Sequence, residues 1–243
     1  MAQAAERASF IKGLLSADFP RLRGLLLAMW LKVRRDSDAG RAGAVGEGER
    51  AELLAALEPL QAQHVARAAT RITESVNTLF AAKAAGGPVG PQPADVAALV
   101  KIVNGAAQSS RTEPELAALV ARRAAGALAL FVGRCGEATR DDAEARALGD
   151  SVTGVQARNL AVYAAAAQLR AALDTIEGGL RKGGAGEAAQ VWVQLRDDVA
   201  ACASRAAAPL FDALGAAVGD ACSLLHAAPL QASGPASPAP GAP

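Results

Sequence analysis

The histidine and cysteine side chains of this chain are too few and too scattered to predict a catalytic or metal site. The histidines, His64 and His226, lie 162 positions apart, and neither has enough spaced ligands around it to complete a metal shell. The three cysteines, Cys135, Cys202 and Cys222, lack C-x-x-C spacing and fall on or near apolar stripes, where a thiol packs as a small hydrophobe. We therefore expect surface or capping roles for the histidines and core packing for the cysteines.

The acidic pairs and the glycine-rich segments do not indicate an active site either. In the pairs 141–142 and 197–198 the aspartates are adjacent, so on a helix their side chains point apart rather than at one substrate. The glycine-rich segments 40–48 and 178–186 follow no expected strand, and the Gly-Lys dipeptide of a phosphate-binding loop does not occur. We predict no catalytic residue, no cofactor and no metal, so an enzyme is the function class that the sequence favours least.

Composition and charge favour a helical protein and disfavour a nucleic-acid binder. The 25 Lys and Arg residues nearly balance the 24 Asp and Glu residues, so the strong basic field of a nucleic-acid-binding domain is absent. Alanine and leucine dominate, which favours helix over strand, and aromatic residues make up only 3%. Cysteine usage fits a reducing cytosol, and we expect no secretory signal and no transmembrane segment.

Apolar residues that recur every three to four positions predict a series of amphipathic helices. Thr112 with Glu115, and Thr153 with Gln156, match the capping box that begins a helix. A proline should split or kink a helix, as Pro59 and Pro209 would here. The expected helices cover residues 18–35, 49–83 (split at Pro59), 95–108, 112–135, 153–180, 187–208 and 210–226.

The expected fold class is all-α, an elongated bundle or rod of about seven to eight amphipathic helices without a sheet. Residues 1–84 are expected to form an N-terminal helical segment that includes a loop over 36–48. Residues 93–228 are expected to form a C-terminal helical bundle. Residues 229–243 contain only Pro, Ala, Ser, Gly, Leu or Gln without periodicity, which predicts a disordered tail.

One face of the first expected helix is a candidate partner-facing surface. It is formed by Phe19, Leu22, Leu26, Trp30 and Val33, which share helical spacing. The apolar stretch is flanked by a basic cluster, a pattern that is also expected of a helix lying on a membrane surface. The cluster consists of Arg21, Arg23, Lys32, Arg34 and Arg35. Packing on a neighbouring helix is the more common outcome for such a face, and membrane-surface binding is the alternative.

Segments spread along the chain resemble a known family. They include DFPRLRGLLLAMWLKV (18–33), HVARAATRITESVNTLF (64–80), TGVQARNLAVYAAAAQLRAAL (153–173) and PLFDALGAAVGDACSLLHAAPL (209–230). Their order and spacing resemble the C-terminal half of subunit five of the conserved oligomeric Golgi complex. The most specific matches are Asn77, Leu79, Phe80, Gln156, Arg158, Asn159, Pro209 and Leu210.

The resemblance implies a non-enzymatic helical subunit of a multisubunit tether that captures vesicles in intra-Golgi retrograde transport. It implies subunit seven of that complex as the main partner, association with SNAREs, and a cytosolic location at the periphery of Golgi membranes. The alternative function is that of an amphipathic helical protein that binds a membrane or lipid surface directly.

Overall fold

The computed structural model describes residues 13, 18–40, 47–81, 90–111 and 113–227, and within these ranges the regular structure is entirely helical. This confirms the predicted all-α class. The six helices in the described ranges are α2 (Phe19–Gly40), α3 (Glu47–Ala81), α4 (Pro93–Ser110), α5 (Pro114–Ala138), α6 (Gly154–Lys182) and α7 (Gly186–Ala227).

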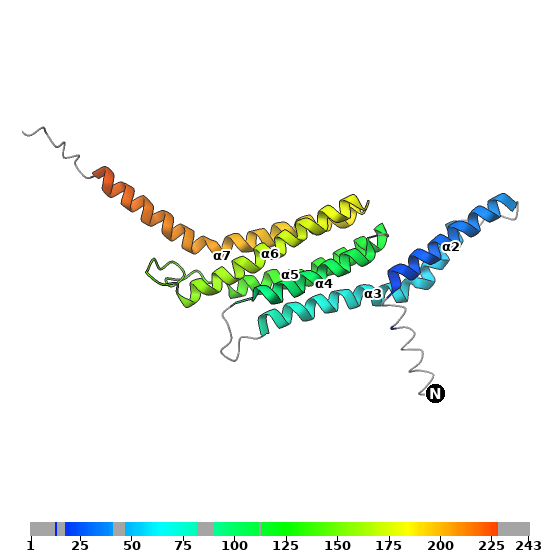
Figure 1. Cartoon of the computed structure of the whole chain (residues 1–243), viewed down its shortest axis with the longest axis horizontal. Coiled ribbons are helices and arrows are strands. Elements are labelled where there is room, and N and C mark those ends of the chain that lie inside the picture. Colours follow the sequence, from blue (N-terminus) through cyan, green and yellow to red (C-terminus); the bar gives the residue numbers. More distant parts are fainter. Residues whose placement is uncertain (1–12, 14–17, 41–46, 82–89, 112, 228–243) are drawn as a thin grey trace, which may run out of the picture.

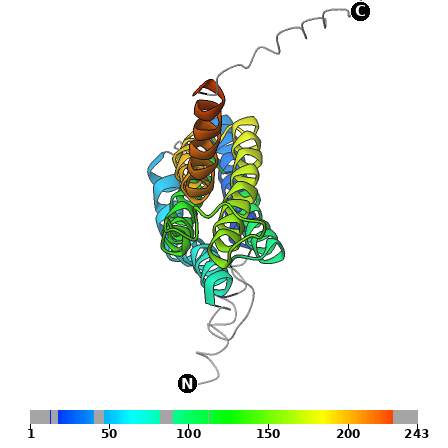
Figure 2. The same ribbon diagram turned by 90° about the vertical axis from the view of Figure 1, so that its left-hand side faces the viewer.

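The helices lie side by side in a layered bundle with a projection at each end (Figure 1). Helix α7 packs on α5 and α6, α5 packs on α3, and α4 lies between α3 and α6. At one end of the bundle α2 pairs with the first part of α3, and at the other end the last part of α7 extends beyond its neighbours (Figures 1 and 2). The two projections are therefore far apart.

The main core consists of one buried stripe from each of the helices α3 to α7. Small side chains, such as Ala117, Ala121 and Ala188, let α5 and α7 approach closely, and Trp192 and Phe131 are the bulkiest fully buried side chains of this core. Leu, Val and Ala dominate it, as the composition predicts. Members of the stripes are Ile72, Val76, Leu79, Val96, Leu99, Val103, Leu128, Phe131, Leu169, Leu173, Trp192 and Val199.

The sequence correctly predicts one helix start and misplaces another. Gln156 N donates to Thr153 Oγ1 (3.1 Å) and Thr153 N donates to Gln156 Oε1 (3.0 Å), which confirms the capping box of α6. The expected box at Thr112 and Glu115 is wrong, because α5 begins at Pro114 with Glu113 as its N-cap and without a side-chain cap. Proline fixes φ for the first helical position and can start a helix without such a cap. Thr112 itself lies outside the described residues.

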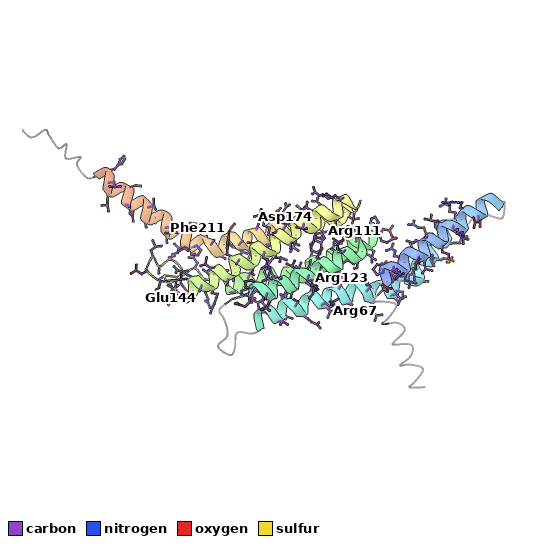
Figure 3. The ribbon with its side chains drawn as sticks, in the orientation of Figure 1. Arg67, Arg111, Arg123, Glu144, Asp174 and Phe211 are labelled. Carbon is purple, nitrogen blue, oxygen red and sulfur yellow. The ribbon has the colours of Figure 1, made fainter. Side chains whose placement is uncertain are left out.

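The two internal prolines do not end their helices. Pro59 lies inside α3 and Pro209 inside α7, so the predicted split at Pro59 is wrong, and of the stop or kink predicted at Pro209 the stop does not occur. The ribbon of α7 changes direction close to Phe211 (Figure 3), as expected where a proline removes one helical hydrogen bond. The loop expected over 36–48 is helical at both of its ends, since α2 reaches Gly40 and α3 begins at Glu47. Residues 41–46 and the expected tail, 229–243, lie outside the described ranges.

A second, smaller core attaches α2 to the bundle. It contains Phe19, Leu57, Val65, Leu116 and Val120, from α2, α3 and α5. At its edge the side chain of Arg23 is buried, with an exposed fraction of 2%. Its Nη2 donates to Glu115 Oε2 (2.6 Å) and its Nη1 donates to Gln61 Oε1 (3.1 Å). Arg23 thus bridges three helices.

Replacing Arg23 with alanine is expected to lower the free energy of unfolding by about 2 kcal/mol, because two charge-assisted contacts are lost. Glu115 is 65% exposed and can be hydrated, so the loss should stay below that of a fully buried ion pair. Urea denaturation followed by circular dichroism measures the effect. Arg21→Ala, an exposed position of the same helix, is the control and should change stability by less than about 0.5 kcal/mol; equal losses would contradict the bridging role.

Candidate protein-binding surface

The last part of α7, residues 209–227, extends from the bundle with its apolar side chains in solvent. We refer to residues 209–227 as the α7 arm. Phe211, Val218 and Leu225 have exposed fractions of 67%, 62% and 76%. In the preceding part of the same helix, Trp192 and Val199 are 1% and 0% exposed. One continuous helix therefore has a covered half and an uncovered half.

Four of the five large exposed apolar side chains of the arm form one stripe, and the fifth, Leu224, lies beside it. Phe211, Leu214, Val218 and Leu225 recur at spacings of three, four and seven residues, which places them on one side of a helix. The charged residues, Asp212 and Asp220, together with Ser223, fall on the opposite side, and the arm has no Lys or Arg. An apolar stripe of this kind is typical of a helix that packs against a second helix or into a groove.

A pocket of about 150 Å³ lies at the base of the arm, between α6 and α7. Its walls include Leu160 and Tyr163 of α6, both 44% exposed, and Phe211 of the arm. The pocket and the stripe share Phe211, so together they form one apolar surface, which we call the arm surface. The size and the apolar walls of the pocket suit a single apolar side chain.

The polar residues beside the pocket are occupied by the chain itself. Asn159 accepts a hydrogen bond from Arg140 N (3.0 Å) and donates one to Arg140 O (2.7 Å). Gln156 Nε2 donates to Ala147 O (2.6 Å) in addition to its capping role. These bonds hold the segment between α5 and α6 against the start of α6. They also engage the side-chain amides of Gln156 and Asn159 within the chain.

The face that the sequence predicted to meet a partner is used inside the chain. Phe19 and Trp30 are 0% and 8% exposed, and Leu22 and Leu26 are half-buried against the neighbouring helices. Only Val33, at 47%, remains open to solvent. The ring of Trp30 also stacks under Arg34, whose guanidinium carbon lies 5.4 Å from the ring centroid. This face is therefore unavailable to a partner while α2 stays docked.

The residues that match the family occupy two regions of the structure. Asn77 is exposed, Leu79 is in the main core, and the ring of Phe80 lies 5.9 Å from that of Phe131; none of the three lines the pocket at the base of the arm. Gln156, Asn159 and Leu210 line the pocket at the base of the arm, Arg158 is half-buried on α6, and Pro209 is buried at the bend of α7.

The residues of the arm surface that sequence reasoning did not single out are Leu160, Tyr163, Phe211, Leu214, Val218 and Leu225. The stripe itself was visible as apolar periodicity in residues 210–226. The same periodicity occurs in the covered half of α7, so the spacing alone could not distinguish an exposed stripe from a core stripe.

The structure also bears on the prediction that no segment is apolar enough to cross a membrane. Helices Pro114–Ala138 and Gly186–His226 are long and apolar enough to cross a membrane by length and composition alone, as core helices of soluble proteins also are. The apolar window is 44% buried in the first helix, as in a core helix, and 6% buried in the second. The absence of a transmembrane segment therefore stays a prediction.

Among the residues that the structure describes, no three His, Cys, Asp or Glu side chains gather where they could hold a metal ion. The arm surface is thus the feature with the clearest capacity for recognition. Comparison of the chain with protein-family models, with curated proteins and with solved structures finds no match.

Proposed function

We propose that this chain is a non-enzymatic, rod-like helical subunit of a multisubunit assembly, which it joins by covering the arm surface with a helix of another subunit. The observation that carries the proposal is the exposure of the α7 arm, in which Phe211, Val218 and Leu225 are more than half exposed. A stripe of large apolar side chains in water is unfavourable, and a partner helix removes it from water.

The arm alone provides only modest affinity. Complete burial of its five large exposed side chains contributes at most about 2 kcal/mol each, or roughly 10 kcal/mol. Association costs about 4 kcal/mol or more, which leaves a dissociation constant on the order of tens of micromolar. Stable membership therefore requires further contacts, and the pocket at the base of the arm can supply one of them. The five side chains are Phe211, Leu214, Val218, Leu224 and Leu225.

We further propose that the assembly is the Golgi vesicle tether of intra-Golgi retrograde transport, with subunit seven of the conserved oligomeric Golgi complex as the main partner and SNAREs as additional ones. Support comes from the resemblance of segments between residues 18 and 230 to subunit five of that complex. Leu210, Gln156 and Asn159, three of the matching residues, line the pocket at the base of the arm. In this proposal the chain is cytosolic and peripheral to Golgi membranes.

Affinity capture with the full chain as bait tests this proposal. Mass spectrometry of the captured proteins is expected to identify other subunits of the Golgi tether, subunit seven foremost. A bait with the helical circular dichroism of a folded chain that recovers no tether subunit would contradict the assignment to this complex.

The second candidate function is direct binding to a membrane or lipid surface, and the apolar, exposed window in α7 favours it. Two observations oppose it. Trp30 and Arg23, which would anchor a basic membrane-surface helix, are buried, and the arm has two aspartates but no Lys or Arg to attract anionic lipid. Flotation with vesicles containing phosphatidylserine separates the candidates: the chain should stay at the bottom of the gradient, whereas flotation that Leu225→Glu abolishes would favour the membrane function.

A further inference from the structure

A groove between α3 and α4 collects positive charge, although the chain as a whole has a formal net charge of only +1. We call it the α3–α4 groove. It has a volume of about 590 Å³, and it is lined by Arg67 and Arg71 of α3 and by Lys101 of α4. No Asp or Glu of the described part of the chain lines it. Its walls therefore carry three permanent positive charges and no negative one.

The three cations of the groove have no acidic partner among the residues that the structure describes. Arg67 and Arg71 are four positions apart on one helix, a spacing at which like charges destabilise the helix. Glu74 and Asp95 line a neighbouring hollow that shares Arg71 with the groove, but neither is ion-paired with Arg71. A bound anion would relieve the repulsion among Arg67, Arg71 and Lys101.

Small residues on α4 leave room between these cations. A Cβ atom added at Gly105 would meet nothing within 4 Å, and the neighbouring wall residues of α4 include Ala98 and Ala106. On α3 the lining runs from His64 to Arg71, which is roughly 10 Å along the helix axis. The groove is therefore long enough for a compact small molecule and too short for a partner helix of several turns.

The side chains of the groove favour phosphate as the anion. A guanidinium group donates two parallel hydrogen bonds to phosphate oxygens, and a lysine adds a point charge, so three such cations suit more than one phosphate group. A nucleotide would also need an aromatic side chain on which its base could stack. Among the described residues no Phe, Tyr or Trp lines the groove, and the ring of His64 lies 5.9 Å from that of Phe19.

We propose that the α3–α4 groove binds a compact polar molecule that carries several phosphate groups, of the chemical class of the inositol polyphosphates. The headgroup of a phosphoinositide has the same chemistry and is the second possible source. The groove shares no residue with the pocket of the arm surface, and α3 and α4 lie on the side of the bundle away from α7 (Figure 1). The site is thus independent of the partner proposed for the arm.

Titration calorimetry of the full chain with inositol hexakisphosphate, at physiological salt, tests the proposal. The wild-type chain should bind the probe, and its thermal unfolding midpoint should rise, since a ligand of the folded state stabilises it. Arg67→Gln with Arg71→Gln should weaken binding by more than about tenfold, because the charge-assisted hydrogen bonds to phosphate are lost. Both arginines are exposed, so this variant should keep the helical circular dichroism of the wild-type chain.

Two further variants separate a built site from a general effect of charge. Arg140→Gln with Arg205→Gln removes the same charge at exposed positions outside the groove and should bind within about twofold of the wild-type chain, because salt screens remote charges. Gly105→Leu leaves the charge unchanged and places a side chain in the open space of the groove, so it should also weaken binding. Leucine favours helix over glycine, so the fold should be retained.

Flotation with phosphatidylcholine vesicles that contain phosphatidylinositol bisphosphate distinguishes the two sources. Flotation that Arg67→Gln with Arg71→Gln abolishes would support the groove with the lipid headgroup as ligand, and binding of the soluble probe without flotation would support it with the free molecule. Three results would overturn the proposal: no binding of inositol hexakisphosphate, equal weakening by the two arginine pairs, or tighter binding of a polyglutamate peptide, which would assign the groove to an acidic protein segment.

Discussion

Replacing Val218 and Leu225 with glutamate is expected to weaken binding to the partner subunit by more than about 100-fold. Both side chains are on the exposed stripe of the α7 arm, with exposed fractions of 62% and 76%. Each substitution removes about 2 kcal/mol of apolar burial at the interface and introduces a charge that has to be desolvated there. Titration calorimetry with the partner recovered by affinity capture measures the change.

The arm offers a matched control for these two substitutions. Ala216→Glu with Ser223→Glu adds the same charge at the same seven-residue spacing, but on the opposite, polar side of the helix. All four positions are exposed, so both double variants should retain the stability of the wild-type chain within about 0.5 kcal/mol per substitution. Equal weakening by both variants would attribute the effect to net charge, and full binding by the stripe variant would exclude the arm surface as the interface.

The sequence predicts the helices well because their signals are local. Periodic apolar residues located α4 and α6, and the hydrogen bonds of Thr153 and Gln156 confirm the capping box inferred from two residue types three positions apart. Pro59 is the exception, since α3 continues through it, whereas α7 changes direction near Pro209. On either side of Pro59, Leu57 and Val65 are buried in the second core, and this packing offsets the loss of one hydrogen bond.

The sequence does not predict what covers each apolar face, because the covering residues come from distant segments. The stripe containing Phe19 and Trp30 is buried against the chain itself, whereas the stripe containing Phe211 and Val218 is exposed. Both have helical spacing. Similarly, Arg21 is exposed and Arg23 is buried, although the two arginines differ by only two positions in the same basic cluster. Only the position of Gln61 and Glu115 beside Arg23 explains the difference.

The burial of the cysteines has the same origin. The sequence predicted core packing for all three, and Cys135 and Cys202 are indeed buried in the main core. For Cys222 the prediction is wrong, because this cysteine lies on the uncovered half of α7 and is exposed. The burial of a cysteine therefore depends on its tertiary neighbours, which helical spacing alone does not reveal.

Replacing Phe131 with alanine is expected to lower the free energy of unfolding by about 3 to 5 kcal/mol, the usual cost of deleting a fully buried aromatic ring. Phe131 is 0% exposed, and its ring packs edge-on against Phe80 of α3 at a centroid distance of 5.9 Å. The substitution leaves a cavity where α3 meets α5 in the main core. Thermal unfolding should show a midpoint that is lower by roughly 10 °C.

Phe211→Ala is the matched control, because it deletes the same ring at a position that is 67% exposed. Its unfolding free energy should change by less than about 0.5 kcal/mol, while its affinity for the partner falls, since Phe211 joins the stripe to the pocket. Phe131→Ala should show the reverse, with lower stability and unchanged affinity at temperatures where it is folded. A large loss of stability in Phe211→Ala would mean that the arm is part of the core, and the argument for a free binding surface would then fail.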